Sequence, residues 1–266
     1  MATKAIRPLS EPHIDISVLI PFYNEAGNIL PLLEEVTAAL EGLAFEIIAV
    51  DDASSDETAA ELKSALGKWP TFLTVRTHIN RVGKSAALIT GLKHVRGTWV
   101  QLLDGDGQND PADTRRVWDA HFAPRDHAHT GIGEDPTRLG LIAGKRTSRN
   151  DSGFKWLQSR TANGIRRAIL DDDVTDTGCG WKFIRAETFR ELPYFAAMHR
   201  YLPALVKRAG WAVIEEPVAD RPRRHGVSKY GFFGRAFAGL FDMFGVFWLL
   251  KRGVRGLDKD WLEEQK

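Results

Sequence analysis

Apolar runs of strand length alternate with segments of helical spacing through the first hundred residues. Four short runs, rich in β-branched and aromatic residues, are predicted as buried strands: residues 16–20, 45–50, 72–76 and 99–103. Between them, apolar residues recur three or four positions apart and predict helices over 29–40, from Ser54 to about Lys68, and over 83–95. The second helix is expected to begin with a capping box, because Glu57 follows Ser54 by three positions. Strands that alternate with helices indicate βαβ units, so we predict an α/β fold with a mostly parallel sheet flanked by helices.

The second half of the chain continues this pattern less regularly. Three further strands are predicted, over residues 139–143, 182–184 and 212–214. A helix is expected around residues 156–169, and residues 124–137, rich in Pro, His and Gly, are expected to form a surface loop. His121, His127 and His129 lie in or near this loop, but their spacing is not that of a metal site.

Acidic side chains come shortly after three of the predicted strands. Glu25 follows the first strand, Asp51 and Asp52 follow the second, and Asp104 and Asp106 follow the fourth. Because ligands of parallel α/β sheets bind at the carboxyl ends of the strands, we expect these acids at the binding edge. We interpret Asp51 or Asp52 as the acceptor for a nucleotide base or ribose. The alternative is that these two residues cap the following helix.

Asp104 and Asp106 are the candidate metal ligands. Residues two apart on an extended strand point to the same side, so the two carboxylates can converge just beyond its end. Carboxylate oxygens suit Mg²⁺ or Mn²⁺, which commonly share their coordination with the phosphates of a substrate. The alternative is that Asp104-Gly105-Asp106-Gly107 is only a polar turn.

The charge of the chain is balanced overall but not locally. A formal net charge of +1 over 266 residues gives no reason to expect a nucleic-acid partner. Residues 221–259, however, carry nine Lys or Arg against two Asp. Within them, Arg221–Tyr230 lacks helical or strand periodicity and is dense in phosphate-binding side chains, so we predict a loop that closes over a diphosphate. A solvated or membrane-facing basic patch is the alternative.

Residues 232–250 form the most apolar segment of the sequence. Asp242 interrupts it, and its uncharged runs are shorter than the roughly 20 residues of a membrane span. Its phenylalanines and flanking basic residues predict an amphipathic helix in the membrane interface; packing on the rest of the protein or on a second subunit is the alternative. A single cysteine and no apolar leader indicate a cytoplasmic protein, associated peripherally with the cytosolic face of the membrane.

Four motifs occur in order along the chain: Ile20–Glu25 (IPFYNE), Val50–Thr58 (VDDASSDET), Asp104–Pro111 (DGDGQNDP) and Arg221–Lys229 (RPRRHGVSK). Together they resemble family 2 glycosyltransferases of the GT-A (Rossmann-like) fold. The sequence is most similar to the branch of dolichol-phosphate mannosyltransferase and bacterial polyprenyl-phosphate sugar transferases. The resemblance covers roughly residues 16–230. It implies a GT-A catalytic domain over 1–230, followed by a membrane-associating or packing segment over 231–266.

The resemblance also implies roles for individual residues. The nucleotide-sugar donor would be bound by Pro21, Tyr23, Glu25, Asp51, Asp52, Lys84, Asp104, Gly105, Asp106 and Ser228. Asp104, Asp106 and Gln108 would hold Mg²⁺ or Mn²⁺ and the donor diphosphate. Arg223 and Lys229 would act with the two aspartates in catalysis, and Arg146 and His199 would lie at the acceptor.

The activity implied is inverting, metal-dependent transfer of a sugar from a nucleotide sugar to a polyprenyl phosphate. Residues 198–203, where many family 2 enzymes place a catalytic acid, contain no carboxylate. A lipid phosphate is already ionised near neutral pH and needs no base, so this departure favours a phosphate acceptor over a hydroxyl. Transfer to a lipid or saccharide hydroxyl, with His199 as a candidate base, and a catalytically silent scaffold are the alternatives.

A second departure concerns the membrane. Many bacterial members of this branch carry transmembrane hairpins after the basic loop, whereas this sequence has one interfacial stretch there. The expected partners are therefore a nucleotide sugar, a lipid phosphate and a membrane surface. The oligomeric state, a homo-oligomer included, is left open.

Overall fold

The computed structural model describes most of the chain between residues 13 and 252. The described residues are 13–122, 138–147, 164, 166–167, 169–172, 174–223 and 232–252, with side chains in the last range from 241 onward. The predicted loop 124–137, most of the predicted helix 156–169, and Ser228 and Lys229 lie outside these ranges.

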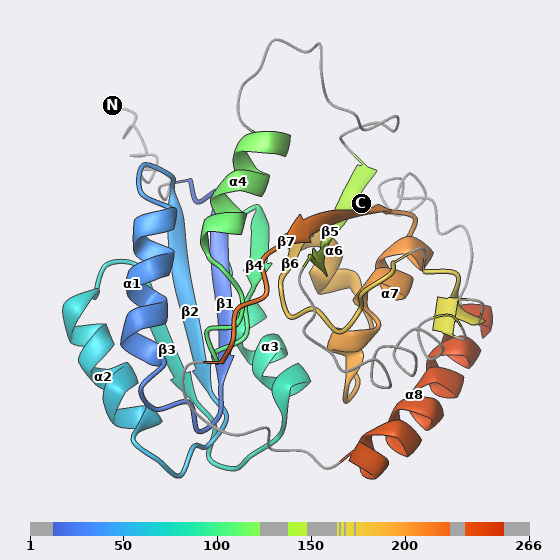
Figure 1. The fold of residues 1–266 in the computed structure, drawn as a ribbon, viewed down its shortest axis with the longest axis horizontal. Helices are drawn as coiled ribbons and strands as arrows, with labels where there is room; N and C mark the ends of the chain where they lie inside the picture. Colours follow the sequence, from blue (N-terminus) through green and yellow to red (C-terminus); the bar gives the residue numbers. More distant parts are fainter. Residues whose placement is uncertain are drawn as a thin grey trace, which may run out of the picture.

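A seven-stranded mixed sheet forms the centre of the molecule, in the order β3-β2-β1-β4-β6-β5-β7 (Figure 1). Its strands are β1 (Ile16–Phe22), β2 (Phe45–Asp51), β3 (Leu73–Thr77), β4 (Trp99–Leu102), β5 (Leu139–Arg146), β6 (Lys182–Arg185) and β7 (Ala212–Val218). The helices are α1 (Ile29–Ala39), α2 (Thr58–Lys68), α3 (Lys84–Leu92), α4 (Ala112–His121), α6 (Ala186–Glu191), α7 (Leu202–Arg208) and α8 (Phe232–Arg252), with a 3₁₀ turn η2 (Met198–Arg200). The predicted α/β fold with a mostly parallel sheet is confirmed.

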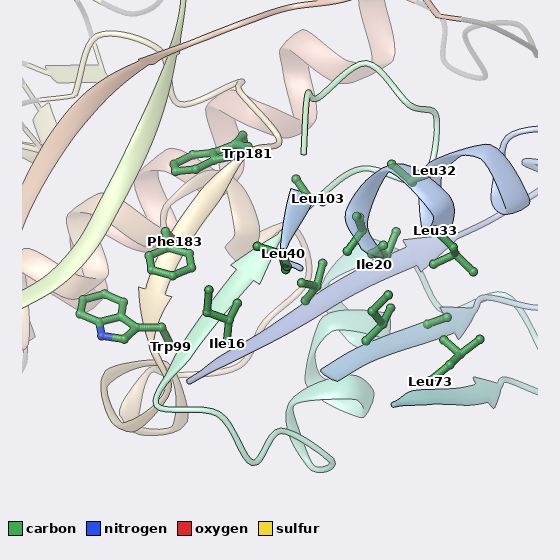
Figure 2. Close-up of a cluster of buried hydrophobic side chains, with 14 of the residues drawn as sticks. Ile16, Ile20, Leu32, Leu33, Leu40, Leu73, Trp99, Leu103, Trp181 and Phe183 are labelled. Carbon is green, nitrogen blue, oxygen red and sulfur yellow. The ribbon is translucent and has the colours of Figure 1, made fainter. Parts of the chain in front are cut away.

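Helices cover both faces of the sheet, because its strands are apolar on both sides. Ile16, Val18 and Ile20 of β1 pack on one face with α1, α2 and α4, and the same cluster continues to Trp99 and Phe183 (Figure 2). On the other face, apolar side chains of α3, α6, α7 and α8 form a second cluster. Side chains alternate along a strand, so the central strands β1, β2 and β4 contribute to both clusters.

β6 is the one described strand that runs antiparallel to its neighbours β4 and β5. Its first residue therefore lies at the edge where the parallel strands end. The register pairs Lys182 with Leu102, two residues before Asp104. This pairing brings the segment Thr177–Lys182 to the acidic residues after β4.

Helix α2 begins four residues later than predicted, and the predicted capping box is wrong. The helix starts at Thr58, and its preceding residue Glu57 makes no side-chain cap. Ser54 Oγ instead donates to Asp51 Oδ1 at 2.5 Å and accepts from the backbone N–H of Asn24 at 2.9 Å. The hydroxyl that the box would need ties the ends of β1 and β2 together.

Helix α8 packs one side on the protein and exposes the other. Met243 and Val246 are buried in the second cluster, and Leu249 and Leu250 pack partly against it. Phe241, Phe244 and Trp248 are 78, 58 and 61 % exposed. Helix α8 therefore combines features of both alternatives left open by the sequence. Among the residues that the structure describes, no helix has both the length and the apolar character required to cross a bilayer.

Candidate active site at the carboxyl edge of the sheet

The loop after β4 holds two carboxylates, each paired with a cation from elsewhere in the chain. Asp104, whose side chain is one-third exposed, forms an ion pair with Lys84 at the start of α3. Asp106 is almost fully buried and forms an ion pair with Arg223 at 2.6 Å. Its Oδ1 also accepts a hydrogen bond from the backbone N–H of Gln108 at 3.1 Å. Four residues predicted for the donor and metal site thus meet at the edge where β1 and β4 end.

Repulsion between the two carboxylates shows in their proton affinities. Burial and the negative charge of Asp104 raise the pKa of Asp106 above its ordinary value, despite the contacts from Gln108 and Arg223. Burial would also raise the pKa of Asp104, but the ammonium of Lys84 brings it below its ordinary value. A divalent cation between the two carboxylates would relieve this repulsion, and their hard oxygens are the ligands that Mg²⁺ and Mn²⁺ prefer. The pair therefore fits such an ion.

Other metal ligands from the protein would have to be neutral. Among the described side chains, no group of three or more His, Cys, Asp or Glu is placed to hold a metal ion. Gln108 lies beside the pair, with its Oε1 3.5 Å from Arg223 and its Nε2 donating to the carbonyl of Arg221 at 3.3 Å. His121, one of the three histidines considered above, instead contacts Glu216 at 2.8 Å.

The first residues of the basic segment, which we define as Arg221–Tyr230, pack directly on the loop that contains Asp104 and Asp106. Asn109 and Asp220 form an isolated antiparallel bridge, and the backbone N–H of Arg221 donates to the carbonyl of Gln108 at 2.9 Å. The Arg221 guanidinium binds Glu35 at 2.7 Å and also pairs with Asp110. These contacts fix the point at which the basic segment leaves the sheet, so Arg223 reaches Asp106.

The residues predicted to bind the nucleotide line the ends of β1 and β2. Asp51 accepts hydrogen bonds from Ser54, and Asp52 accepts from the backbone N–H groups of Val82 and Gly83 at 2.9 and 2.8 Å. Asp52 also contacts His78 at 2.9 Å. These bonds position the loop that leads into α3, and hence Lys84.

Tyr23, Glu25 and Gly105 complete the set of predicted donor-site residues in this region. The Arg81 guanidinium lies over the Tyr23 ring at 4.1 Å, and the backbone N–H of Glu25 donates to Thr58 Oγ1 at 2.9 Å. A Cβ at Gly105 would lie 2.6 Å from the ring of Phe22 and 3.0 Å from the carbonyl oxygen of Pro21. Only glycine therefore lets this loop pass so close to β1.

A cavity of about 340 Å³ opens beside Asp104, on the α3 side of the sheet. Its polar lining comes from α3, β6, the 3₁₀ turn and the segment before β6: Lys84, Asp104, Thr177, Cys179, Lys182, His199 and Arg200. Ser85 Oγ lies 2.9 Å from His199 Nδ1. Burial lowers the pKa of His199 well below its ordinary value, so the ring is neutral near pH 7. His199, predicted at the acceptor, thus lies in the same cavity as Lys84 and Asp104, which are predicted to bind the donor.

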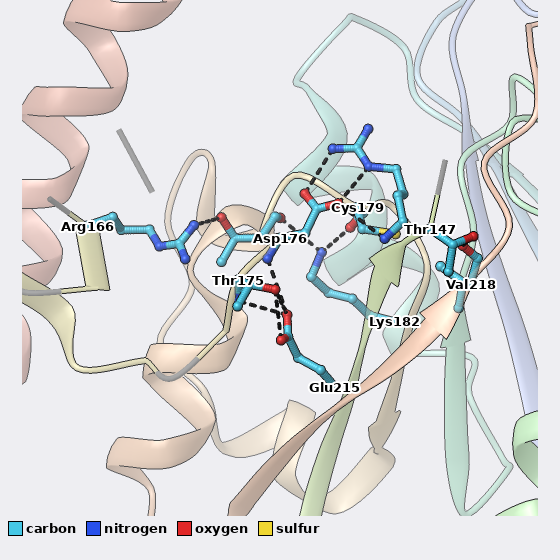
Figure 3. A network of polar contacts seen from close by, with 10 residues as sticks. Thr147, Arg166, Thr175, Asp176, Cys179, Lys182, Glu215 and Val218 are labelled. Carbon is cyan, nitrogen blue, oxygen red and sulfur yellow. Dashed lines mark hydrogen bonds and ion pairs between the residues drawn. The ribbon is translucent and has the colours of Figure 1, made fainter. Parts of the chain in front are cut away.

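Arg146, the other residue predicted at the acceptor, binds Asp176 of an adjoining polar network that also includes Thr175 and Glu215 (Figure 3). Its guanidinium donates to both carboxylate oxygens of Asp176, at 2.7 and 2.9 Å. Glu215 of β7 accepts from the backbone N–H and the hydroxyl of Thr175. The network holds the segment that runs from Thr175 to Lys182 along the cavity.

The local sequence around several residues of this site does not predict that they belong to it. Asp176, Gly180, Lys182 and Arg200 reach the cavity or its lining segment only through the antiparallel pairing of β6 with β4. The run Asp176–Lys182, in which two glycines flank a cysteine, is the one local hint that the chain passes close to another group.

Gly180 offers a direct test of this packing. A Cβ there would lie 2.3 Å from Asp104 Oδ2 and 2.9 Å from Asn109 Oδ1, so Gly180→Ala must displace the Asp104 carboxylate. We expect activity to fall by about 10²-fold, the usual cost of an ångström-scale misplacement. The fold should persist, because a carboxylate can rotate away. Turnover and circular dichroism measure the two effects; unchanged turnover would contradict the geometry.

The family model and the sequence relatives that match this chain all concern enzymes that transfer sugars. The model of "Glycosyl transferase family 2" matches residues 17–192. The dodecaprenyl-phosphate galacturonate synthase of Rhizobium johnstonii is 30% identical over 258 residues, covering 94% of this chain and 72% of that protein. The undecaprenyl-phosphate 4-deoxy-4-formamido-L-arabinose transferase of Edwardsiella ictaluri is 32% identical over 219 residues, covering 81% of this chain. The chain spans 63% of the length of that second relative.

Solved structures share the fold at low sequence identity. A mannosyltransferase from Pyrobaculum calidifontis, in complex with GDP-Man and Mn²⁺, superposes with a TM-score of 0.61 at 19% identity, covering 95% of this chain and 69% of that one. Glucosyl-3-phosphoglycerate synthase from Mycobacterium tuberculosis, in complex with Mn²⁺, UDP and its product, gives 0.59 at 17% identity, covering 86% and 76%. At this identity the likeness concerns the fold.

Proposed function

Since the chain belongs to glycosyl transferase family 2, we propose that it transfers a sugar from a nucleotide sugar to a polyprenyl phosphate. The observation that carries this proposal is the pair Asp104 and Asp106, each bound to a cation, with Asp104 and Lys84 lining a polar cavity. Both relatives described above are named for transfer to a polyprenyl phosphate. They differ in the sugar, so their names leave the donor of this chain open.

We propose that Asp104, Asp106 and Gln108 hold Mg²⁺ or Mn²⁺, which would neutralise charge on the departing nucleoside diphosphate. Lys84 and Arg223 balance the two carboxylates, and with an ion bound there they would be available to the diphosphate oxygens. Lys229 and Ser228 would add donors from the rest of the basic segment. Asp51, Asp52 and the ring of Tyr23 would frame the nucleoside.

The acceptor phosphate is proposed to attack the anomeric carbon from the cavity, with inversion. Among the described residues that line the cavity, Asp104 is the one carboxylate, and it faces Lys84. Apart from Asp104, which is proposed to hold the metal, no described carboxylate lines the cavity to act as a general base, which suits an acceptor that is already ionised. Arg146 and neutral His199 would orient the phosphate rather than deprotonate it.

The test compares acceptors under otherwise identical conditions. Purified protein is incubated with Mn²⁺ and a panel of nucleotide sugars, and with either undecaprenyl phosphate or diacylglycerol. We expect a glycosylated polyprenyl phosphate and release of the nucleoside diphosphate, both abolished by EDTA. Transfer to diacylglycerol alone would replace this proposal by the hydroxyl-acceptor alternative. Absence of transfer or hydrolysis from every donor would favour the silent scaffold.

We further propose that α8 associates the enzyme with the cytosolic face of the membrane. Phe241, Phe244 and Trp248 project from the side opposite to the buried Met243 and Val246. Burying one such aromatic side chain contributes about 1.5–3 kcal/mol, and basic residues at the end of the helix suit anionic head groups.

Serine at both Phe244 and Trp248 is expected to weaken binding to phosphatidylglycerol vesicles by at least about tenfold, measured by co-sedimentation. Tyr194, half exposed after α6, provides a matched aromatic control, and Tyr194→Ser should bind as the unaltered protein does. Equal binding of the double variant would mean that α8 does not contact the membrane.

A further inference from the structure

The cavity beside Asp104 has an excess of positive charge. Lys84, Lys182 and Arg200 line it, against Asp104 as the one carboxylate among the described lining residues. Lys84 is already paired with Asp104. Lys182 and Arg200 form no ion pair with a described acidic side chain, although the charges of Asp104 and Asp176 act on Lys182 and partly offset its burial.

Lys182 is the more deeply placed of these two cations. It is 4 % exposed, and its ammonium donates to the backbone carbonyls of Thr177, at 3.3 Å, and Cys179 (Figure 3). Carbonyl oxygens orient an ammonium but do not neutralise it, and the nearby charges of Asp104 and Asp176 offset the cost of burying it only in part. The cost shows in the pKa of Lys182, which burial lowers to about 8. An anion in the cavity would offset it.

Arg200 approaches the same space from the 3₁₀ turn. Its guanidinium forms neither a hydrogen bond nor an ion pair with any described residue, although it lines the cavity. A free guanidinium fork matches a carboxylate or phosphate with two parallel hydrogen bonds. The buried ammonium of Lys182 and the less buried guanidinium of Arg200 could therefore both donate hydrogen bonds to one oxyanion in the cavity.

The position of Lys182 indicates whether the oxyanion belongs to the donor sugar or to the acceptor phosphate. Its strand register pairs it with Leu102, two residues before the donor-anchoring Asp104, so it lies at the donor end of the cavity. Under the proposed function, the sugar of a donor anchored at Asp104 would lie at this end of the cavity, beside β6.

We propose that the sugar transferred by this enzyme carries a carboxylate, as in a hexuronic acid, and that Lys182 and Arg200 bind it. This inference rests on the proposed function and narrows its donor. With a neutral hexose, neither cation would have an oxyanion partner on the donor. Sites built for a charged or hydrogen-bonding group reject analogues that lack it, so we expect a preference of about 10²-fold for the uronate.

Binding is measured first without acceptor, so that transfer is not required. Matched nucleotide sugars that differ only at the carboxylate are compared by calorimetry with Mn²⁺: UDP-glucuronate with UDP-glucose, UDP-galacturonate with UDP-galactose, and GDP-mannuronate with GDP-mannose. We expect one uronate to bind about 10²-fold more tightly than its neutral partner. Equal affinity within every pair that binds would overturn the inference and leave the proposed function intact. No binding of any donor would instead remove the proposed function itself.

Variants then assign the preference to the two cations. Lys182→Met keeps the length and apolar stem of the side chain, and Arg200→Gln keeps a polar side chain in the less buried position. Each is expected to reduce uronate affinity by at least about tenfold while neutral-sugar affinity stays the same. Arg208→Gln, on the exposed end of α7, makes the same charge change outside the cavity and should retain the preference.

The acceptor phosphate is the other possible oxyanion, and steady-state kinetics distinguish its binding from that of the sugar carboxylate. If the cations bind the acceptor, the variants raise KM for undecaprenyl phosphate and leave donor affinity unchanged, which would overturn the inference. If they bind the sugar, uronate affinity falls and KM for the acceptor is retained. Because Arg200 is only half-buried and its side chain forms no hydrogen bond or ion pair with a described residue, the result for Arg200→Gln stands even if Lys182→Met fails to fold.

Discussion

Asparagine in place of Asp106 is expected to reduce sugar transfer by about 10²- to 10³-fold. The substitution keeps the shape of the side chain but removes one of the two negative charges that are proposed to anchor the metal and, through it, the diphosphate. The folded protein should be retained. Because burial and Asp104 raise the pKa of Asp106, its ionised form is disfavoured in the folded state, and a neutral side chain relieves that cost at pH 7.

Two measurements separate this effect from unfolding. Transfer is followed as nucleoside diphosphate release, and the melting temperature is recorded with and without Mn²⁺. Mn²⁺ should raise the melting temperature of the unaltered protein, since a ligand that binds only the folded state stabilises it, and this increase should be lost in Asp106→Asn.

Asp110 in the same loop is the matched control for Asp106. It pairs with Arg221 and accepts a hydrogen bond from the backbone N–H of Ala112, so it is not a candidate metal ligand. Asp110→Asn should keep the response to Mn²⁺ and most of the activity. A full Mn²⁺ response in Asp106→Asn would mean that Asp106 does not bind the ion.

The acidic centre of the site can be predicted from the sequence because its determinants are local. The predicted strand over residues 99–103 sets the edge at which both aspartates lie. In the structure they are close enough for the charge of Asp104 to raise the pKa of Asp106, although their loop is a turn and not extended strand. The parallel topology follows from the alternation of strands and helices. These arguments need no information about distant contacts.

The cationic half of the cavity depends on pairing between segments far apart in the sequence. Lys182 lies in an apolar strand whose direction no local pattern specifies, and only its antiparallel register with β4 brings it to the site. Arg200 depends in addition on a single 3₁₀ turn. Tertiary contacts decide such positions, as they also decide that Ser54 binds Asp51 and Asn24 instead of capping α2.

The hydrophobic pattern does not predict helix α4, and the reason is different. Thr114 and Val117 are its buried positions, and Trp118 is partly buried, whereas charged residues cover the remainder. Arg115 and Asp119 form an exposed ion pair along that outer surface. So few apolar positions give too weak a periodic signal to identify a helix of ten residues.

The pair of Arg146 and Asp176 is expected to determine the stability of the cavity wall. Asp176→Ala should lower the free energy of unfolding by about 3 kcal/mol, because it leaves the largely buried Arg146 guanidinium without its counter-ion. Urea denaturation measures this loss. Asp119→Asn breaks the exposed pair with Arg115, whose side chains are 42 and 44 % exposed, and should cost no more than about 0.5 kcal/mol.

A double variant separates stability from function at this pair. Replacing a buried ion pair by apolar residues of similar size is often neutral or stabilising, so Arg146→Met with Asp176→Leu should recover most of the free energy that Asp176→Ala loses. If Arg146 also orients the acceptor phosphate, the stable double variant will still have a raised KM for polyprenyl phosphate. Recovery of both stability and KM would give Arg146 a purely structural role and leave His199 as the remaining described candidate at the acceptor.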